Sequence, residues 1–349
     1  METHALMVPH PSGRARTLST LHWPLRRRWM TEVEVLDRGA HGPVALAVRL
    51  GLARGYDAVV IDGATGGATR VADLGAAAVL ARRPGGPAVV VTDATWKRGV
   101  GALDRAACKL GLLAIDSPRT TYCVLSSEER RLFPRTWGVD PERVEHTPFY
   151  FTASDEELAA PVRTGGGVFA GGDSLRDYRP LVEAARGLPA RVTLATGALP
   201  AELAAHAPPN VAVGRVTPAD YMALMRAADV VVVALAPGQE RSAGQQNYLN
   251  AMAFGKVVIV PDVMGVRDHV EPGATGLVVP PGEPRAMREA IEWALSHPAE
   301  AAAMGARARE VVRQRFTPDR YVAAVLGVVE RAVGRLRAAR RGLAAGRSA

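Results

Sequence analysis

The sequence predicts an α/β protein with two doubly wound parallel-sheet domains. The chain has 349 residues, which is longer than one typical domain and sufficient for two buried cores. Short apolar runs alternate with amphipathic segments, as repeated strand and helix units require. Hydrophobic residues make up 48% and charged residues 22%, which are the proportions of a globular protein.

The first half shows this alternation from about Glu32 onward. Strands are predicted at residues 33–36, 58–61, 88–91 and 123–126, and helices at 44–54 and 71–82. Ser127 is expected to open a further helix with Glu128 and Glu129 in its first turn, where acidic side chains suit the positive end of the helix dipole. Apolar strands separated by helices indicate a parallel sheet.

A linker is predicted between Thr147 and Gly167, where prolines, an acidic patch and three glycines interrupt the pattern. The second half then repeats the alternation, with strands at 168–170, 192–195, 211–213, 230–234, 257–260 and 277–279. The predicted segments are a basic N-terminal segment over 1–31, domains over 32–160 and 165–316, and a C-terminal helix with a basic tail over 317–349.

The net charge of +8 is concentrated at the two ends of the chain. Residues 1–31 carry +4 and residues 331–349 carry +6, which leaves −2 for the remainder. Basic ends suit peripheral contact with an anionic membrane surface better than a nucleic-acid groove, and they equally suit solvated tails. No stretch is apolar enough to span a bilayer, and the N-terminus is a poor secretion signal. With only Cys108 and Cys123, a reducing cytoplasm is expected.

One apolar stripe marks the last long helix. It comprises Val322, Val325, Leu326, Val329, Val333 and Leu336 at helical spacing. Packing onto the preceding domain and contact with a membrane both account for such a stripe.

A glycine-rich turn follows the strand at 168–170. Gly171 and Gly172 allow the backbone to approach a ligand, and the helix expected to follow this turn offers amides that favour a phosphate. Arg176 lies in this turn, and its planar guanidinium is suited to bind such an anion through two hydrogen bonds. Thr217 as a helix cap and Pro218 at the first helical position predict another helix, which contains Tyr221.

The longest motif runs from Gly238 to Lys256. It contains Ser-Ala-Gly-Gln-Gln-Asn at 242–247 and Ala-Met-Ala-Phe-Gly-Lys at 251–256, and Gly-Ala-Thr-Gly-Leu-Val-Val-Pro-Pro-Gly follows at 273–282. These motifs resemble the retaining glycosyltransferases of family four (group 1 glycosyl transferases). The resemblance is dense over 165–316 and looser over 33–146, where Trp137-Gly-Val-Asp-Pro-Glu-Arg-Val144 is similar to the end of the acceptor domain.

The resemblance implies a GT-B fold, in which two Rossmann-like doubly wound parallel-sheet domains face a central cleft. The second domain would bind a nucleoside diphosphate sugar. The expected donor-binding residues are Gly171, Gly172, Arg176, Tyr221, Ser242, Ala243, Gly244, Gln245, Gln246, Asn247 and Asn250. The amides of Gly244 and Gln245 would contact the diphosphate, because ligands of open parallel sheets lie at the carboxyl edge.

The sequence departs from the family at two positions. Family members carry two glutamates eight positions apart, where this chain has Ser242 and Asn250. Glu240 is a candidate replacement for the missing catalytic carboxylate. Asp93 follows the strand at 88–91, where the family often has a histidine, and is expected either to contact a sugar or acceptor hydroxyl, to act as a base, or to cap its loop.

The predicted activity is sugar transfer to an unidentified acceptor with retention of configuration, with Glu240, Asp93 and Arg176 as catalytic residues. Neither a cofactor nor a metal is expected, because Arg176 and loop amides would stabilise the leaving diphosphate and no residue cluster has metal-ligand spacing. The main alternative is a non-catalytic relative that binds a sugar nucleotide or a partner. A dinucleotide oxidoreductase has little support because the first strands lack G-x-G-x-x-G. The expected location is cytoplasmic, with the inner face of the membrane as an open alternative.

Overall fold

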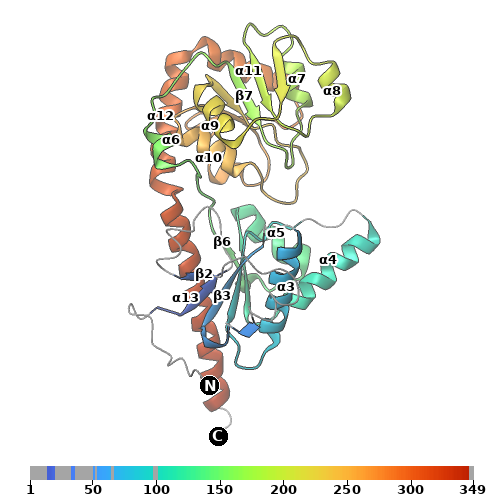
Figure 1. Cartoon of the computed structure of the whole chain (residues 1–349), viewed down its shortest axis with the longest axis vertical. Coiled ribbons are helices and arrows are strands. Elements are labelled where there is room, and N and C mark those ends of the chain that lie inside the picture. Colours follow the sequence, from blue (N-terminus) through green and yellow to red (C-terminus); the bar gives the residue numbers. More distant parts are fainter. Residues whose placement is uncertain are drawn as a thin grey trace. The chain divides into compact units, whose positions relative to one another are not determined.

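The computed structural model describes residues 14–19, 33–35, 50–51, 53–63, 67–96 and 101–345. The chain divides into two compact units, one comprising Met1–Thr147 with Tyr321–Ala349 and the other Pro148–Arg320. Each unit is built on one parallel sheet of six strands (Figure 1). The predicted α/β class is therefore confirmed. Most of the helix expected over 44–54 lies outside the described residues.

The sheet of the first unit has the strand order β2-β1-β3-β4-β5-β6. Its strands are β1 (Thr17–Ser19), β2 (Glu34–Val35), β3 (Ala58–Asp62), β4 (Ala88–Thr92), β5 (Thr120–Val124) and β6 (Val144–His146). The order reverses between β1 and β3, which makes that point the topological switch of a doubly wound sheet. Strand β1 pairs with both β2 and β3, although the sequence analysis did not predict it.

Helices α3 (Gly67–Arg82), α4 (Ala102–Ile115) and α5 (Ser127–Trp137) belong to the same unit, with 3-10 turns at Ala53–Gly55 and Pro141–Arg143. Helix α5 begins where the sequence predicts, but its cap is Ser126, whose hydroxyl accepts a hydrogen bond from the Glu129 amide at 3.1 Å. Glu129 in turn accepts from the Ser126 hydroxyl and the Leu125 amide. This exchange fixes the turn between β5 and α5.

The C-terminal helix α13 (Pro318–Ala345) packs on the first unit, not on the domain that precedes it in sequence. Val322, Val325, Val329 and Val333 of the predicted apolar stripe are buried there, so the protein itself covers these side chains. The expected basic tail is helical to residue 345, and several of its arginines bind the first unit: Arg331 pairs with Glu145, Arg335 with Thr121, Arg337 with Asp57 and Arg340 with the Gly86 carbonyl.

The sheet of the second unit has the order β12-β11-β10-β7-β8-β9. Its strands are β7 (Val168–Gly171), β8 (Val192–Ala195), β9 (Val211–Gly214), β10 (Val230–Val232), β11 (Val257–Pro261) and β12 (Leu277–Val279). All neighbours are parallel. This is the Rossmann order, and its switch point lies between β7 and β10.

The helices of the second unit are α6 (Asp155–Ala159), α7 (Arg179–Ala184), α8 (Ala201–Ala205), α9 (Pro218–Ala227), α10 (Gln245–Ala253), α11 (Pro284–Ser296) and α12 (Pro298–Arg315), with a 3-10 turn at Val266–Asp268. Two buried clusters fill the sheet faces. One packs α10 and α12 residues such as Leu249 and Val312 beneath β10 and β11, and the other packs α7 and α11 residues such as Leu181 and Ile291. The predicted linker contains helix α6, which is capped by Ser154. The Phe151 amide of the linker donates to the Phe316 carbonyl.

Candidate active site

The site expected for the donor lies at the carboxyl ends of β7 and β10. Three segments meet there: the turn at 171–178, the loop before α10, and the first turn of α10. The turn is fixed to the chain beyond β10, because the Asp177 amide donates to the Ala234 carbonyl at 2.9 Å and Arg176 forms a bridge with Leu235. Parallel strands that diverge at a switch point leave room for a ligand at this edge.

Two glycines allow close packing in the turn. A Cβ added to Gly171 would lie 2.4 Å from the Tyr221 ring, so only glycine fits beneath this tyrosine. Gly172 has φ of +97°, and a Cβ there would lie 3.1 Å from both Arg176 Nη2 and Asn247 Nδ2. The glycines therefore let a guanidinium and a carboxamide approach the backbone at one point.

Arg176 is held in place by carbonyl groups of its own turn. Its Nε donates to the Gly171 carbonyl at 3.2 Å and its Nη1 to the Ser174 carbonyl at 2.7 Å. Burial lowers the pKa of Arg176, and the nearby Tyr178, Tyr221 and Asp173 partly offset that effect. Helix α7 begins only at Arg179, so Arg176 lies in the turn three residues before this helix. Its side chain lies close to Gly172.

Helix α10 begins at Gln245, directly at this edge. Gly244 precedes it in the left-handed region with φ of +78°, and its carbonyl accepts from the Asn247 amide at 2.9 Å. The first N–H groups of a helix have no acceptor in a preceding turn, so they are available to an anion. Gln245 is 5% exposed, and within the described chain its Nε2 has no hydrogen-bond partner.

Other side chains of the predicted donor site meet the same turn. Asn247 Nδ2 donates to the Gly171 carbonyl at 2.9 Å, so this residue bridges α10 and the end of β7. Ser242 is buried and Ala243 is half-buried in the loop before α10. Arg241 donates to the Ser174 hydroxyl at 3.4 Å, which ties that loop to the glycine turn. Glu240 precedes it as an exposed side chain.

The structure directs Asn250 and Gln246 toward the linker. Asn250 Oδ1 accepts from the amides of Thr152 at 2.7 Å and Ala153 at 3.1 Å, and its Nδ2 donates to the Thr152 hydroxyl at 3.0 Å. Gln246 Nε2 donates to the same hydroxyl at 3.1 Å. Asn250 is 1% exposed and its carboxamide is engaged in these hydrogen bonds, so it anchors the linker, although the sequence predicts it as a donor-binding residue.

Sequence reasoning missed a group of polar residues that follow the carboxyl ends of β7 and β8. Asp173 accepts from the Thr196 hydroxyl at 2.7 Å and the Gly197 amide at 2.9 Å, and these hydrogen bonds lower the pKa of Asp173. The Tyr178 hydroxyl donates to the Gly172 carbonyl at 2.6 Å, and this hydrogen bond stabilises the glycine turn. The signal available in the sequence was the Thr-Gly pair after the strand at 192–195.

Asp93 belongs to the first unit, at the carboxyl end of β4. It adopts φ of +48°, an uncommon conformation for a residue other than glycine that is often found at functional sites. Tyr321 of α13 donates its hydroxyl hydrogen to Asp93 Oδ1 at 3.0 Å. Burial, and then the charge of Asp62, raise the pKa of Asp93 to about 7, while the Tyr321 hydrogen bond opposes this shift. A carboxyl with such a pKa exchanges a proton near neutral pH.

The arrangement at the second sheet is suited to a phosphate-bearing ligand. A guanidinium, a carboxamide and the amides of a helix N-terminus converge on glycines that expose the backbone. Among the described residues, no group of histidine, cysteine or acidic side chains could hold a metal ion.

Comparison with known proteins finds a family match over a segment that contains most of the loops at this edge. Residues 172–297 match the family described as glycosyl transferases group 1. Over 133 residues the chain is 36% identical to D-rhamnosyltransferase WbpZ of Pseudomonas aeruginosa, a match that covers 36% of this chain and 34% of that protein. The chain thus spans about a third of the length of that curated relative.

Solved structures share the architecture over most of the chain. A glycosyltransferase from Rickettsia africae has a TM-score of 0.62 at 13% identity, covering 90% of this chain and 89% of that one. HepE from Anabaena, solved in complex with UDP-glucose, has a TM-score of 0.62 at 17% identity, covering 89% and 91%. The resemblance to group 1 glycosyl transferases and the predicted GT-B fold are confirmed.

Proposed function

We propose that this protein, a GT-B chain whose residues 172–297 match the glycosyl transferases group 1, transfers a sugar from a nucleoside diphosphate sugar to an acceptor. The observation that carries the proposal is the convergence of Arg176, Asn247 and the start of α10 on the backbone of Gly171 and Gly172. This cluster offers positive charge and N–H donors at the switch point of a Rossmann sheet, where a diphosphate would bind.

The same groups would stabilise the nucleoside diphosphate as it leaves the donor sugar. As the bond between the anomeric carbon and the donor phosphate breaks, negative charge grows on the leaving oxygen. The Arg176 guanidinium and the first amides of α10 stabilise that charge, which is the role a metal ion plays in other glycosyltransferases. We therefore propose a metal-independent transfer. Retention of the anomeric configuration is proposed from the family resemblance.

We assign the acceptor to the first unit. Asp93 supports this assignment, because it combines a strained backbone, a position at a strand end and a pKa of about 7. A carboxyl with that pKa is able to accept a proton from an acceptor hydroxyl near neutral pH. Tyr321 holds one of its oxygens and so orients the other.

A second candidate function is sugar-nucleotide binding without turnover. It is favoured by Ser242 and Asn250, which replace the two glutamates of the family, and by the engagement of Asn250 with the linker backbone. Glu240 is the replacement carboxylate in the catalytic proposal.

Binding and turnover measured on the same preparation distinguish these functions. UDP, GDP, ADP and dTDP are screened by thermal shift, since a ligand that binds only the folded state raises its stability. The sugar conjugates of the diphosphate that binds are then tested for hydrolysis and transfer. Binding with turnover supports the transferase, binding without turnover supports the second function, and the absence of any nucleotide binding refutes both.

We further propose a cytoplasmic location at the inner face of a membrane. The basic N-terminal residues and the two cysteines, both free in the structure, support this placement. None of the described helices is long and apolar enough to cross a bilayer.

A further inference from the structure

Helix α4 of the first unit exposes an unusual amount of apolar surface. Of its residues, only Leu112 and Ile115 are buried. Leu103 is 88% exposed, Leu110 66% and Leu113 51%. Isolated leucines on a surface are ordinary, but three on one short helix form a patch of the kind that marks an interaction site.

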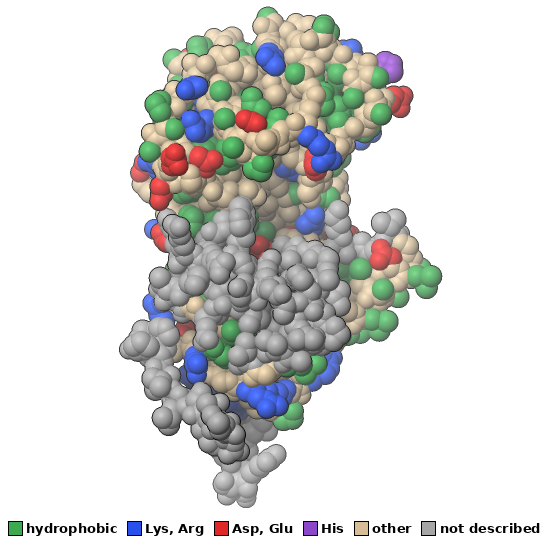
Figure 2. Space-filling view, viewed as in Figure 1, with side chains coloured by type: hydrophobic (Ala, Val, Ile, Leu, Met, Phe, Trp, Pro, Cys, Tyr) green, Lys and Arg blue, Asp and Glu red, His purple; other side chains and the backbone are tan. Residues whose placement is uncertain are grey.

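The exposed leucines lie on the side of the helix opposite its buried residues. Leu103 and Leu110 are seven positions apart, so they project from the same face, and Leu113 lies one turn beyond Leu110. Alanines 106, 107 and 114 share this outward face and are also exposed. Hydrophobic side chains gather over α4 at the right of Figure 2.

Basic side chains flank this apolar face on the side of α4 toward α5, where Arg105 lies seven positions before the buried Leu112 and therefore on the same side of the helix. Arg105 and Lys109 of α4, together with Arg135 of α5, line a groove of about 310 Å³ beside it. Arg135 also lines a larger groove of about 830 Å³ with Arg130 and Arg131. Two exposed acids, Asp104 and Glu128, lie on the same two helices, so cations predominate.

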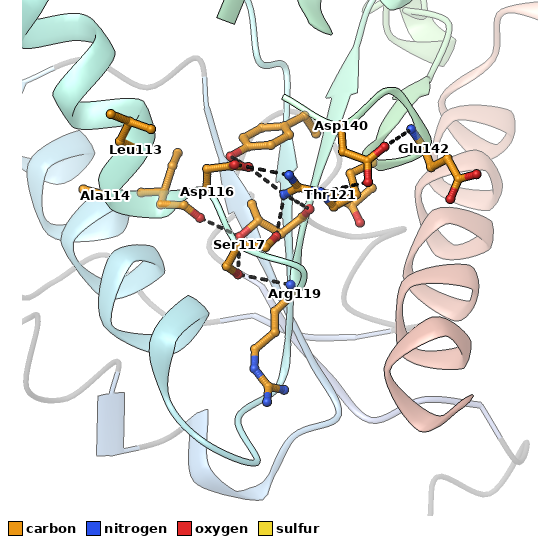
Figure 3. Close-up of polar contacts among 12 residues, drawn as sticks. Leu113, Ala114, Asp116, Ser117, Arg119, Thr121, Asp140 and Glu142 are labelled. Carbon is orange, nitrogen blue, oxygen red and sulfur yellow. Dashed lines mark hydrogen bonds and ion pairs between the residues drawn. The ribbon is translucent and has the colours of Figure 1, made fainter. Parts of the chain in front are cut away.

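The helix is anchored at its C-terminal end. Asp116, the residue after α4, forms an ion pair with Arg143 at 2.6 Å and accepts from the Tyr122 hydroxyl at 3.0 Å (Figure 3). Arg82 of α3 donates to the carbonyls of Leu113 and Ala114. The outward face is therefore presented by a helix whose last turn is fixed to the sheet.

We propose that the outward face of α4 docks on an anionic lipid bilayer. Leu103, Leu110 and Leu113 would enter the boundary between headgroups and acyl chains, while Arg105, Lys109 and Arg135 bind lipid phosphates. An apolar face with a basic border is the pattern of helices that lie in a membrane interface. Charge complementarity selects the bilayer over a second copy of this chain, because two copies would bring these cations together.

This surface is distinct from the basic chain ends that the sequence pointed to, and it is independent of the donor site. Purified full-length protein is sedimented with vesicles of phosphatidylcholine and phosphatidylglycerol in equal parts, and with phosphatidylcholine alone. Leu103→Glu/Leu110→Glu removes two apolar anchors and adds like charge, so binding to the anionic vesicles should fall by about tenfold or more. Val162→Glu, at a 53% exposed apolar residue of the second unit, is the matched control and should bind as the parent does.

A second variant tests the charge. Arg105→Gln/Lys109→Gln/Arg135→Gln should bind anionic vesicles more weakly at low salt and show a shallower dependence on salt. Thermal unfolding and nucleoside diphosphate binding of each variant verify the fold and the donor site separately. The proposal is overturned if the double leucine variant binds like the parent, if the parent binds both vesicle types equally, or if light scattering shows that the leucine change dissolves a dimer without altering vesicle binding.

Discussion

Replacing Arg176 with alanine tests the donor site directly. The guanidinium lies against Gly172, oriented by the carbonyls of Gly171 and Ser174. A hydrogen bond to a charged group contributes about 1.5–3 kcal/mol. If one such bond to the diphosphate is lost, the Kd should rise roughly 10- to 150-fold, because each 1.4 kcal/mol is a factor of ten. Lysine should recover only part of this loss, since an ammonium cannot contact both carbonyls and the ligand in the same geometry.

Arg179→Ala is the matched control. It removes the same charge three residues later, from a side chain that is 77% exposed and pairs with Asp177. Such a surface pair should change the Kd by less than about twofold. Isothermal titration calorimetry with the diphosphate that gives the largest thermal shift measures both variants, and circular dichroism verifies their fold. An unchanged Kd for folded Arg176→Ala would refute the assigned role of this residue.

Three further changes test the other assignments. Glu240→Gln should lower kcat far more than donor affinity if Glu240 stabilises only the transition state, and a parental rate would reject it as the replacement carboxylate. Asp93→Asn should flatten the pH dependence of stability. The folded protein binds this proton more tightly than the unfolded chain does. The parent's unfolding free energy should therefore fall as the pH rises from about 3.8, the ordinary pKa, to about 7. Urea unfolding at several pH values checks the sign. Asn250→Ala should cost about 1–3 kcal/mol of unfolding free energy by leaving two linker amides without acceptors, and a selective loss of diphosphate binding would instead return Asn250 to the donor site.

The strands of the second unit could be predicted closely because their signal is local. Continuous apolar runs bounded by turn residues gave 192–195 and 277–279 with the bounds the structure has. The prediction for β10 extended two residues too far. The Val233 amide still donates to Ile259 of β11, but the Ala234 carbonyl and Leu235 pair with the glycine turn, at Asp177 and Arg176, instead of continuing the sheet.

The first unit was predicted less completely. Strand β1 has only three residues, two of them polar, and it is a strand only because β2 and β3 flank it in the sheet. Pairing between segments that are distant in sequence leaves no local pattern to detect. Helix α4 was missed because apolar residues lie on both its buried and its exposed sides, so no single apolar stripe marks it in the sequence.

The sequence by itself determined the strand, turn and helix units of the donor edge, because glycines, caps and apolar periodicity act over a few residues. It thereby identified Gly172, Arg176 and Asn247, which the structure brings together. Only the tertiary structure decided that Asn250 anchors the linker and that Tyr321, 228 residues away, holds Asp93. Those hydrogen bonds join segments that packing alone brings within 3.5 Å of one another, and a side chain's chemistry does not specify which distant partner will reach it.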